Sequence, residues 1–291
     1  IGINVHSHDW TYLANKLTDF SPYILAGDYS NFGPQADINL LFHVVDIQIA
    51  WLKQQGYDRE AIQQCEMLKY ELLHAPVIVG RYLLRFYAGM HSGNAATVIL
   101  NSGLNSLYIR LAWKAIMRKT GYGSMENFNK FVLLFSNGDD VIMSVKHEVI
   151  HLFNNESIQN FFLSHGIKYT NSKKDQDCVP YEDIADVQYL KCNFRRHPSR
   201  SEWLAALDWA SVKETPLWIW KSNMDPVEAT IQNIDQAVRL AYGHGETKFN
   251  EFKSLCYQML EYLHIYHPLP DWEDLDIRIW DHNDTSGFLF L

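Results

Sequence analysis

Two adjacent aspartates, Asp139 and Asp140, stand where the sequence predicts the tip of a β-hairpin. Short runs rich in Val, Ile, Leu and Phe flank Asn137 and Gly138, and Asn-Gly between such runs is a strong hairpin signal. Neighbouring carboxylates repel each other and are costly at the edge of an apolar core unless a cation lies between them. Their oxygen atoms suit hard divalent cations such as Mg²⁺. A solvated Asp-rich turn is the commoner origin of such a pattern, so the rest of the chain must decide.

A third carboxylate, Asp28, follows the apolar stretch Tyr23–Ala26, which predicts a buried strand ending at Gly27 and Asp28. One aspartate at a strand end and two on a distant hairpin match the needs of two-metal phosphoryl transfer, because carboxylates from separate strands can hold two ions. Taken alone, Asp28 is more typical of a turn.

The segment Gly89–Asn101 lies between these carboxylates in the sequence. Its small residues would let a loop approach a ligand closely. Ser92, Thr97 and Asn101 carry hydroxyl and amide groups able to recognise a ribose. The alternative is a glycine-bearing loop that precedes a helix and supplies ordinary caps.

The elements that must position these residues follow from apolar periodicity and turn chemistry. Helical spacing is found at residues 37–56, 58–75, 98–120, 155–165 and 225–242. Asp58 and Asp225 are suited to cap the helices that follow them, and Gly243 to end the last helix. Besides the hairpin, short strands are expected at residues 23–28, 76–79, 166–170 and 188–191.

Composition bounds the class of protein. The 291 residues are 47% hydrophobic, which is ample for a core, and their apolar runs are too short for a membrane span. The net charge of −9 argues against a surface that is basic throughout, as in many nucleic-acid binders. Basic residues do crowd between Lys191 and Arg200, and local charge decides what a groove binds, although an ordinary solvated face is the simpler explanation. The chain begins with Ile1, which suggests a piece of a longer precursor.

The order of the motifs resembles that of the viral RNA-dependent RNA polymerases. An Asp-bearing strand is followed by Ser-Gly-x₃-Thr-x₃-Asn over residues 92–101 and then by Gly-Asp-Asp over residues 138–140. Gly27–Pro34 and Asn101–Arg110 are similar to the picorna-like group, particularly the dicistroviruses and iflaviruses of arthropods. The resemblance covers essentially the whole chain.

Two later segments agree with this resemblance. Gly166–Asp175 is similar to the fourth palm motif of the family, and Tyr189–Phe194 is similar to its primer-grip motif. The implied fold is α+β: a right-hand polymerase palm, in which helices flank an antiparallel sheet, followed by a mostly helical thumb. Residues 1–197 would form the palm with part of the fingers, and residues 198–291 the thumb.

The resemblance implies roles for individual residues. Asp28 and Asp139 would ligate two Mg²⁺ ions with help from Asp140, Mn²⁺ being a possible substitute. The 3′-hydroxyl of the growing RNA would attack the α-phosphate of an NTP, and Lys174 would act as general acid toward the leaving pyrophosphate.

Binding roles follow in the same way. Ser92, Gly93, Thr97 and Asn101 would bind the NTP and select its ribose through the 2′-hydroxyl. The basic residues Lys191 and Arg195 would hold the phosphates of the product strand. The implied partners are template and product RNA, NTPs, an upstream fingers region of the same polyprotein and, in many relatives, a protein primer. The implied location is the host cytoplasm, at membrane-associated replication complexes.

The sequence departs from the family pattern at three points. Many relatives have a second aspartate five residues after the first, where this chain has Gly33, so sugar selection would rest more on Asn101 and Ser92. The residue before Gly-Asp-Asp is often Tyr and here is Asn137. The N-terminal fingers would precede Ile1, so we expect these 291 residues alone to bind RNA weakly and polymerise poorly.

Two alternatives belong to other functional classes. His147–His151 matches the HExxH pattern of zinc metalloproteases, in which two histidines bind zinc and the glutamate acts as base. The pattern is short, and no third-ligand signature follows it, so we disfavour this reading. The other alternative is a non-catalytic, polymerase-like module that binds RNA or partners, against which the three aspartates argue.

Overall fold

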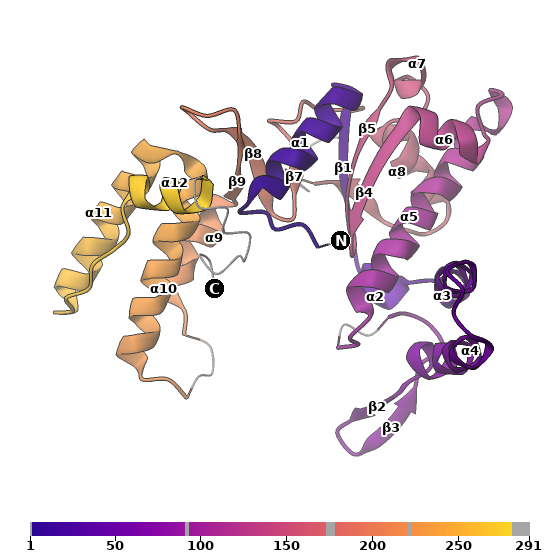
Figure 1. Cartoon of the computed structure of the whole chain (residues 1–291), viewed down its shortest axis with the longest axis horizontal. Coiled ribbons are helices and arrows are strands. Elements are labelled where there is room, and N and C mark those ends of the chain that lie inside the picture. Colours follow the sequence, from indigo (N-terminus) through magenta and orange to yellow (C-terminus); the bar gives the residue numbers. More distant parts are fainter. Residues whose placement is uncertain (1, 91–92, 173–177, 220–222, 281–291) are drawn as a thin grey trace. The chain divides into compact units, whose positions relative to one another are not determined.

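The computed structural model of the chain describes residues 2–90, 93–172, 178–219 and 223–280 (Figure 1). The chain forms two compact units, one of residues 20–182 and the other of residues 2–19 together with 183–291. Each unit has its own hydrophobic core. The predicted α+β class is confirmed, since both units combine antiparallel sheets with helices.

The first unit is built on a four-stranded antiparallel sheet. Its strands run in the order β4 (Val132–Asn137), β5 (Asp140–Val145), β1 (Ile24–Tyr29) and β6 (Tyr169–Asn171). The hairpin predicted around the two aspartates is the β4–β5 pair. The predicted first strand is longer than expected: β1 continues to Tyr29, so Asp28 lies within the strand.

One face of this sheet shares a hydrophobic core with helices α5 (Thr97–Ile116) and α8 (Asn155–Ser164). Alternate residues of β1 and β5 point to that core, as the two-residue period of a strand requires. The strand residues Leu25, Tyr29, Val141 and Met143 pack there with the helix residues Leu104, Trp113, Ile158 and Phe162. Helix α5 therefore lies along the sheet that carries the aspartates.

The predicted helices that precede α5 are also present. They are α3 (Ile38–Gln54) and α4 (Arg59–Leu73), and the Asp58 side chain accepts a hydrogen bond from the Ala61 backbone N–H at 2.7 Å, as a helix N-cap does. The other helices of this unit are α2 (Phe32–Gln35), the 3₁₀ turn η1 (Met117–Lys119), α6 (Met125–Phe131) and α7 (His147–Ile150). A separate hairpin pairs β2 (Pro76–Val79) with β3 (Tyr82–Arg85), and its side chains are mostly exposed.

The second unit joins a three-stranded sheet to a group of helices. Its elements are α1 (His8–Phe20), β7 (Gln188–Tyr189), β8 (Cys192–Arg196), β9 (Trp203–Leu207), α9 (Trp209–Glu214), η2 (Thr215–Leu217), α10 (Pro226–Ala241), η3 (Tyr242–His244), α11 (Glu246–Tyr262) and α12 (Trp272–Trp280). Helix α1 packs on the sheet because the Trp10 ring stacks on Phe194 at 4.1 Å and the Trp203 backbone N–H donates to the Thr11 hydroxyl at 2.9 Å. None of the helices in the described ranges is both long and apolar enough to cross a membrane.

Two expectations for this region differ from the structure. A boundary at residue 198 would divide the β8–β9 hairpin, whose strands pair from Cys192–Leu207 to Arg196–Trp203. The expected C-terminal cap, Gly243, instead lies inside η3, where a Cβ atom would come 2.1 Å from the Ala205 carbonyl oxygen. Glycine is required there because the two backbones approach closely. The assignment of the two units as palm and thumb stays a prediction.

Candidate active site

The three predicted carboxylates lie at the same end of the four-stranded sheet. The β1–β5 ladder ends with the pair Gly27–Val141, and Asp28 and Asp140 are the next residues on the two strands. Asp139 lies in the hairpin loop beside them and is exposed, whereas Asp28 and Asp140 are half-buried. Residues more than a hundred positions apart in the sequence are thus brought together by strand pairing.

The hairpin loop differs by one residue from the sequence expectation. Asn137 and Asp140 form the last pair of the β4–β5 ladder, so the two loop residues are Gly138 and Asp139. Gly138 has a φ of 64°, a conformation that glycine adopts without steric cost at the first position of a two-residue hairpin loop. Asp140 is therefore the first residue of β5, not part of the loop tip.

A divalent ion fits the donor chemistry at this place. Three carboxylates offer only hard oxygen ligands, which Mg²⁺ and Mn²⁺ accept. Within the described residues, no three His, Cys, Asp or Glu side chains already converge closely enough to hold an ion. Asp28, Asp139 and Asp140 would therefore have to turn toward a common point on binding, and they remain predicted ligands.

Helix α5 holds the hairpin loop through two buried polar residues that the sequence analysis missed. The Asn105 amide donates to the Asp139 carbonyl oxygen at 2.8 Å and lies 3.2 Å from that of Gly138. The Ser102 hydroxyl accepts a hydrogen bond from the Gly138 backbone N–H at 2.7 Å. Their signal in the sequence is the appearance of two polar residues, three positions apart, on the apolar face of a predicted helix.

A cavity of about 810 Å³ lies beside the loop. Its lining includes three residues of the predicted site, Thr97, Asn101 and Asp139. Asn101 is 8% exposed, and its side-chain oxygen has no hydrogen-bond partner among the described residues. A buried acceptor without a partner is costly, so this atom is suited to receive a hydrogen bond from a ligand. The apolar remainder of the lining includes Phe32 and Met90.

Thr97 has a more restricted role than the sequence suggested. Its hydroxyl donates to the Asn94 carbonyl oxygen at 2.6 Å at the start of α5. The proton of that hydroxyl is thus occupied, and the oxygen can only accept from a ligand.

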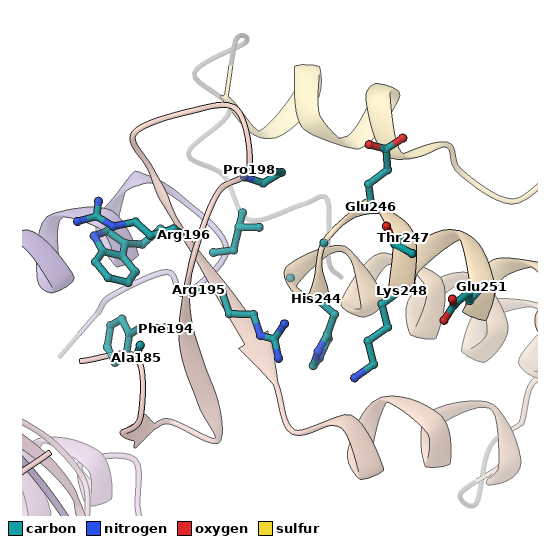
Figure 2. Close-up of a pocket in the computed structure, with 14 residues that line it drawn as sticks. Ala185, Phe194, Arg195, Arg196, Pro198, His244, Glu246, Thr247, Lys248 and Glu251 are labelled. Carbon is teal, nitrogen blue, oxygen red and sulfur yellow. The ribbon is translucent and has the colours of Figure 1, made fainter. Parts of the chain in front are cut away.

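A second cavity of about 900 Å³ lies in the second unit, between β8 and the start of α11. Arg195 from β8 and Lys248 from α11 point into the same space, with His244 between them (Figure 2). Burial and the positive charges of Arg195 and Lys213 lower the pKa of Lys248. Glu246 and Glu251 also line the cavity, so the positive charge is concentrated at Arg195 and Lys248, and that part of the cavity favours an anionic ligand. The sequence analysis did not select Lys248.

Lys191 lies in a strained turn. It forms the two-residue loop of the β7–β8 hairpin with Leu190, and both residues have positive φ values of 60° and 51°, respectively. Positive φ at both positions suits the twist of a hairpin but is unfavourable for residues with a Cβ atom. Strain of this kind often accompanies a functional constraint, and the Lys191 side chain is exposed at the turn.

Comparison with known proteins decides which family these features belong to. A family profile described as viral RNA-dependent RNA polymerase matches residues 1–264. The chain belongs to this family. The resemblance to the picorna-like polymerases is thereby confirmed, and it is supported by dicistrovirus and iflavirus polyproteins among the relatives.

Several relatives of this viral polymerase chain are viral polyproteins. The chain is 33% identical over 283 residues to the genome polyprotein of Deformed wing virus. This alignment covers 96% of the chain and 10% of that polyprotein. It is 29% identical over 262 residues to the replicase polyprotein of Drosophila C virus (strain EB), covering 87% of the chain and 15% of the polyprotein. The chain thus spans a small part of the curated relatives that it matches.

The fold agrees with a solved polymerase structure. The Sicinivirus 3Dpol RNA-dependent RNA polymerase superposes with a TM-score of 0.75 at 16% sequence identity. The match covers 97% of this chain and 55% of that polymerase. At this identity the likeness concerns the fold.

Three predicted residues of this polymerase chain receive no support from the geometry. Ser92 and Lys174 lie outside the described residues. Gly93 is exposed, and a Cβ atom at its position would have no neighbour within 4 Å among the described residues. Their predicted roles therefore rest on the sequence resemblance alone.

Gly33, which departs from the family pattern, lines the first cavity. Its carbonyl oxygen accepts a hydrogen bond from the Met90 backbone N–H at 2.8 Å and so ties α2 to the loop after β3. A longer side chain at this position would face the Met90 carbonyl oxygen, 3.2 Å from the Cβ position. Gly33 thus contributes backbone contacts at a wall of the cavity.

The HExxH segment has a structural role in this fold. His147 begins the short helix α7 just after β5, and its Nδ1 atom lies 3.0 Å from the Tyr23 hydroxyl. Family membership does not favour the metalloprotease alternative.

Proposed function

We propose that this chain supplies the catalytic part of an enzyme that extends RNA on an RNA template by nucleotidyl transfer. The observation that carries the proposal is that one cavity is lined both by Asp139 and by Asn101, whose side-chain oxygen has no hydrogen-bond partner among the described residues. A nucleoside triphosphate requires carboxylates that hold metal ions at its phosphates and a buried acceptor for a hydroxyl of its sugar.

The proposed roles rest on the family resemblance and agree with where the described residues lie. Asp28 and Asp139, with Asp140 assisting, would hold two Mg²⁺ ions, and Mn²⁺ would serve in their place. When bound, the ions supply positive charge that stabilises the attacking and leaving oxygens of the transferred phosphoryl group. By holding the ions, the carboxylates would help to place the 3′-hydroxyl of the product strand against the α-phosphate. The new bond from the 3′-oxygen to the α-phosphorus would form as the bond to pyrophosphate breaks.

Sugar recognition would rest mainly on Asn101. A ribose 2′-hydroxyl can donate to its amide oxygen, which has no other partner among the described residues. A 2′-deoxyribose has no such donor and would leave the oxygen unsatisfied. Thr97 would accept a second hydroxyl. On the sequence resemblance, Ser92 and Gly93 would bind the NTP, and Lys174 would protonate the pyrophosphate.

The product strand would lie against the basic residues of the second unit. Lys191 and Arg195 would hold its phosphates, and Lys248, which lines the same cavity as Arg195, adds positive charge beside it. Phosphates are held largely by such charges without regard to base sequence.

An upstream region of the polyprotein is the proposed partner of the β2–β3 hairpin. The side chains of Ile78, Tyr82 and Leu83 are largely exposed, and a two-stranded hairpin is marginally stable unless another layer covers it. We expect that layer to be the fingers region. We further propose that synthesis occurs in the host cytoplasm at membrane-associated complexes and begins in some cases on a protein primer.

The experiment that tests the proposal is primer extension on an RNA template by the protein with its upstream region. Extension should require Mg²⁺ or Mn²⁺ and should be lost in Asp139→Asn, whereas Asp19→Asn, the same change at an exposed aspartate on α1, should retain it. Asn101→Ala should lower the preference for rNTP over dNTP up to roughly tenfold, the value of one lost hydrogen bond.

Two outcomes would contradict the proposal. If a folded, RNA-binding parent extended no primer with either ion, the non-catalytic scaffold would become the better explanation. If the 291 residues alone synthesised RNA robustly and processively, the proposed need for the upstream region would be wrong.

A further inference from the structure

The Gly138–Asp139 loop receives much of its support from helix α5. Within the β4–β5 ladder, pairing ends at Asn137 and Asp140, so the carbonyl groups at the tip have no strand partner there. The side-chain N–H₂ of Asn105 lies 3.2, 2.8 and 3.4 Å from the carbonyl oxygens of Gly138, Asp139 and Asp140, respectively. The 2.8 Å contact is the principal hydrogen bond, and one amide thus serves three consecutive carbonyls.

A third element binds the other end of this amide. The Tyr29 hydroxyl donates to Asn105 Oδ1 at 3.1 Å, which leaves the nitrogen of the amide facing the loop. A flipped amide would place its oxygen against three carbonyl oxygens, which is unfavourable, whereas the Tyr29 hydroxyl can bond to either end of the amide.

The same helix face holds the N–H side of the loop. Ser102 lies three residues before Asn105, accepts from the Gly138 N–H at 2.7 Å, and donates its own proton to the Val98 carbonyl oxygen at 2.6 Å. The Ser136 hydroxyl also donates to the Ser102 carbonyl oxygen at 3.0 Å. Asn105 is 0% exposed and Ser102 3%, so water cannot replace these bonds without local opening.

Helix α5 therefore connects three parts of the site. Asn105 bonds to the loop that bears Asp139 and to Tyr29, the residue that follows Asp28 on β1. Asn101, which lines the nucleotide cavity, lies one helical turn before Asn105. Movement of the loop relative to β1 would break at least one of these bonds.

We propose that Asn105 is a positioning residue that sets the spacing of Asp28, Asp139 and Asp140 for divalent ions by bonding both to the hairpin loop and to Tyr29. The inference rests on the proposed function, because it concerns ions held by those carboxylates. Asn105 touches neither ion nor nucleotide and acts through the backbone of the residues that do. Groups that orient metal ligands from outside typically change metal affinity or activity by about 10- to 100-fold when removed.

The test measures metal binding as well as activity. Asn105→Ala removes the amide, and Asn105→Asp keeps its shape but places an acceptor against the loop carbonyls. Mn²⁺ binding is measured from the electron paramagnetic resonance signal of free Mn²⁺. We expect both variants to raise the Mn²⁺ concentration for half-saturation by about 10- to 100-fold. The Mn²⁺ concentration for half-maximal extension should rise in parallel, while KM for the NTP at saturating Mn²⁺ changes little.

A matched control separates positioning from loss of stability. Asn155 is also a fully buried asparagine of the first unit, and its side chain has no hydrogen-bond partner among the described residues. Asn155→Ala should leave Mn²⁺ affinity unchanged. The Gly138 amide should also exchange its hydrogen faster in Asn105→Ala, by up to roughly tenfold, but not in Asn155→Ala.

Two further variants keep the proposal falsifiable if Asn105→Ala does not fold. Tyr29→Phe removes the bond to Asn105, and Ser102→Ala removes the bond to the Gly138 N–H together with that to the Val98 carbonyl oxygen; each should weaken Mn²⁺ binding by smaller factors. Unchanged Mn²⁺ affinity in folded Asn105 variants, or in both Tyr29→Phe and Ser102→Ala, would overturn the positioning role. If Asp139→Asn also left Mn²⁺ binding unchanged and the parent extended no primer, the proposed function itself would fail, so the two failures are distinguishable.

Discussion

Gly27, the residue before Asp28, is expected to be intolerant of even one added methyl group. A Cβ atom at Gly27 would lie 1.8 Å from the Tyr169 hydroxyl oxygen, 2.0 Å from Cζ and 2.5 Å from Cε2. Real Cβ contacts are essentially never shorter than 3.0 Å, so the ring would have to retreat by more than about 1 Å. Tyr169 is 2% exposed and packs against Tyr29 and Phe162 at centroid distances of 4.9 and 5.3 Å, which leaves it no room to do so.

The expected cost of Gly27→Ala can be worked from these contacts. Overpacking a rigid core typically destabilises by about 1–3 kcal/mol, and contacts this short belong at the upper end. Alanine also lowers the conformational entropy of the unfolded chain, which offsets about 0.5 kcal/mol of this destabilisation. The free energy of unfolding should therefore fall by about 2.5 kcal/mol, which for a unit of this size lowers Tm by roughly 5–10 °C.

A double-mutant cycle followed by urea and thermal unfolding identifies the contact. Tyr169→Phe removes the hydroxyl but not Cζ, so Gly27→Ala should remain costly in that background. Tyr169→Leu removes all three clashing atoms, and there the added methyl should cost little, giving a coupling energy of about 2–3 kcal/mol. Gly93→Ala is the matched control for stability, since its Cβ would meet nothing within 4 Å. A Gly27→Ala protein as stable as the parent, with no coupling to Tyr169, would refute the reasoning.

Three more predictions concern other elements. Asp58→Ala should lower the free energy of unfolding by about 1 kcal/mol by removing the α4 cap, and Asp58→Asn, which keeps an acceptor, should restore most of it; equal thermal stability of the two variants would contradict the cap. Leu190→Gly and Lys191→Gly should each stabilise by about 0.5–1 kcal/mol because they relieve positive φ, but only the second should reduce the salt dependence of RNA binding, by about one unit of slope. Burial lowers the pKa of His244 to about 4 in the folded protein, below its unfolded value, so its contribution to stability is present above about pH 6.5 and is lost as the pH falls toward 4. His244→Gln should flatten the dependence of the urea midpoint on pH across that window, and an unchanged slope would show that His244 is not the group responsible.

Local chemistry made much of the fold predictable. The β4–β5 hairpin, helices α3 and α4, and the Asp58 and Asp225 caps depend on turn residues and on periodicity within a few residues, which a sequence displays directly. The one-residue shift at the Asn137–Asp140 turn shows the limit of that information, because two loop registers share the same residues. The strand β9 was missed because only its pairing with β8, through tertiary packing, makes Trp203–Leu207 extended.

The candidate site divides in the same way. The residue types and the order of Asp28, Asn101 and Asp139 were sufficient to indicate a polymerase family, since motif order is a property of the chain. Tertiary structure alone placed Asn105 against the hairpin loop, Tyr169 over Gly27, and Lys248 beside Arg195. Each of these contacts joins residues separated by more than thirty positions, and its distance depends on how whole helices and strands pack. The sequence by itself therefore determined which groups the chemistry needs, and packing decided which buried groups hold them in place.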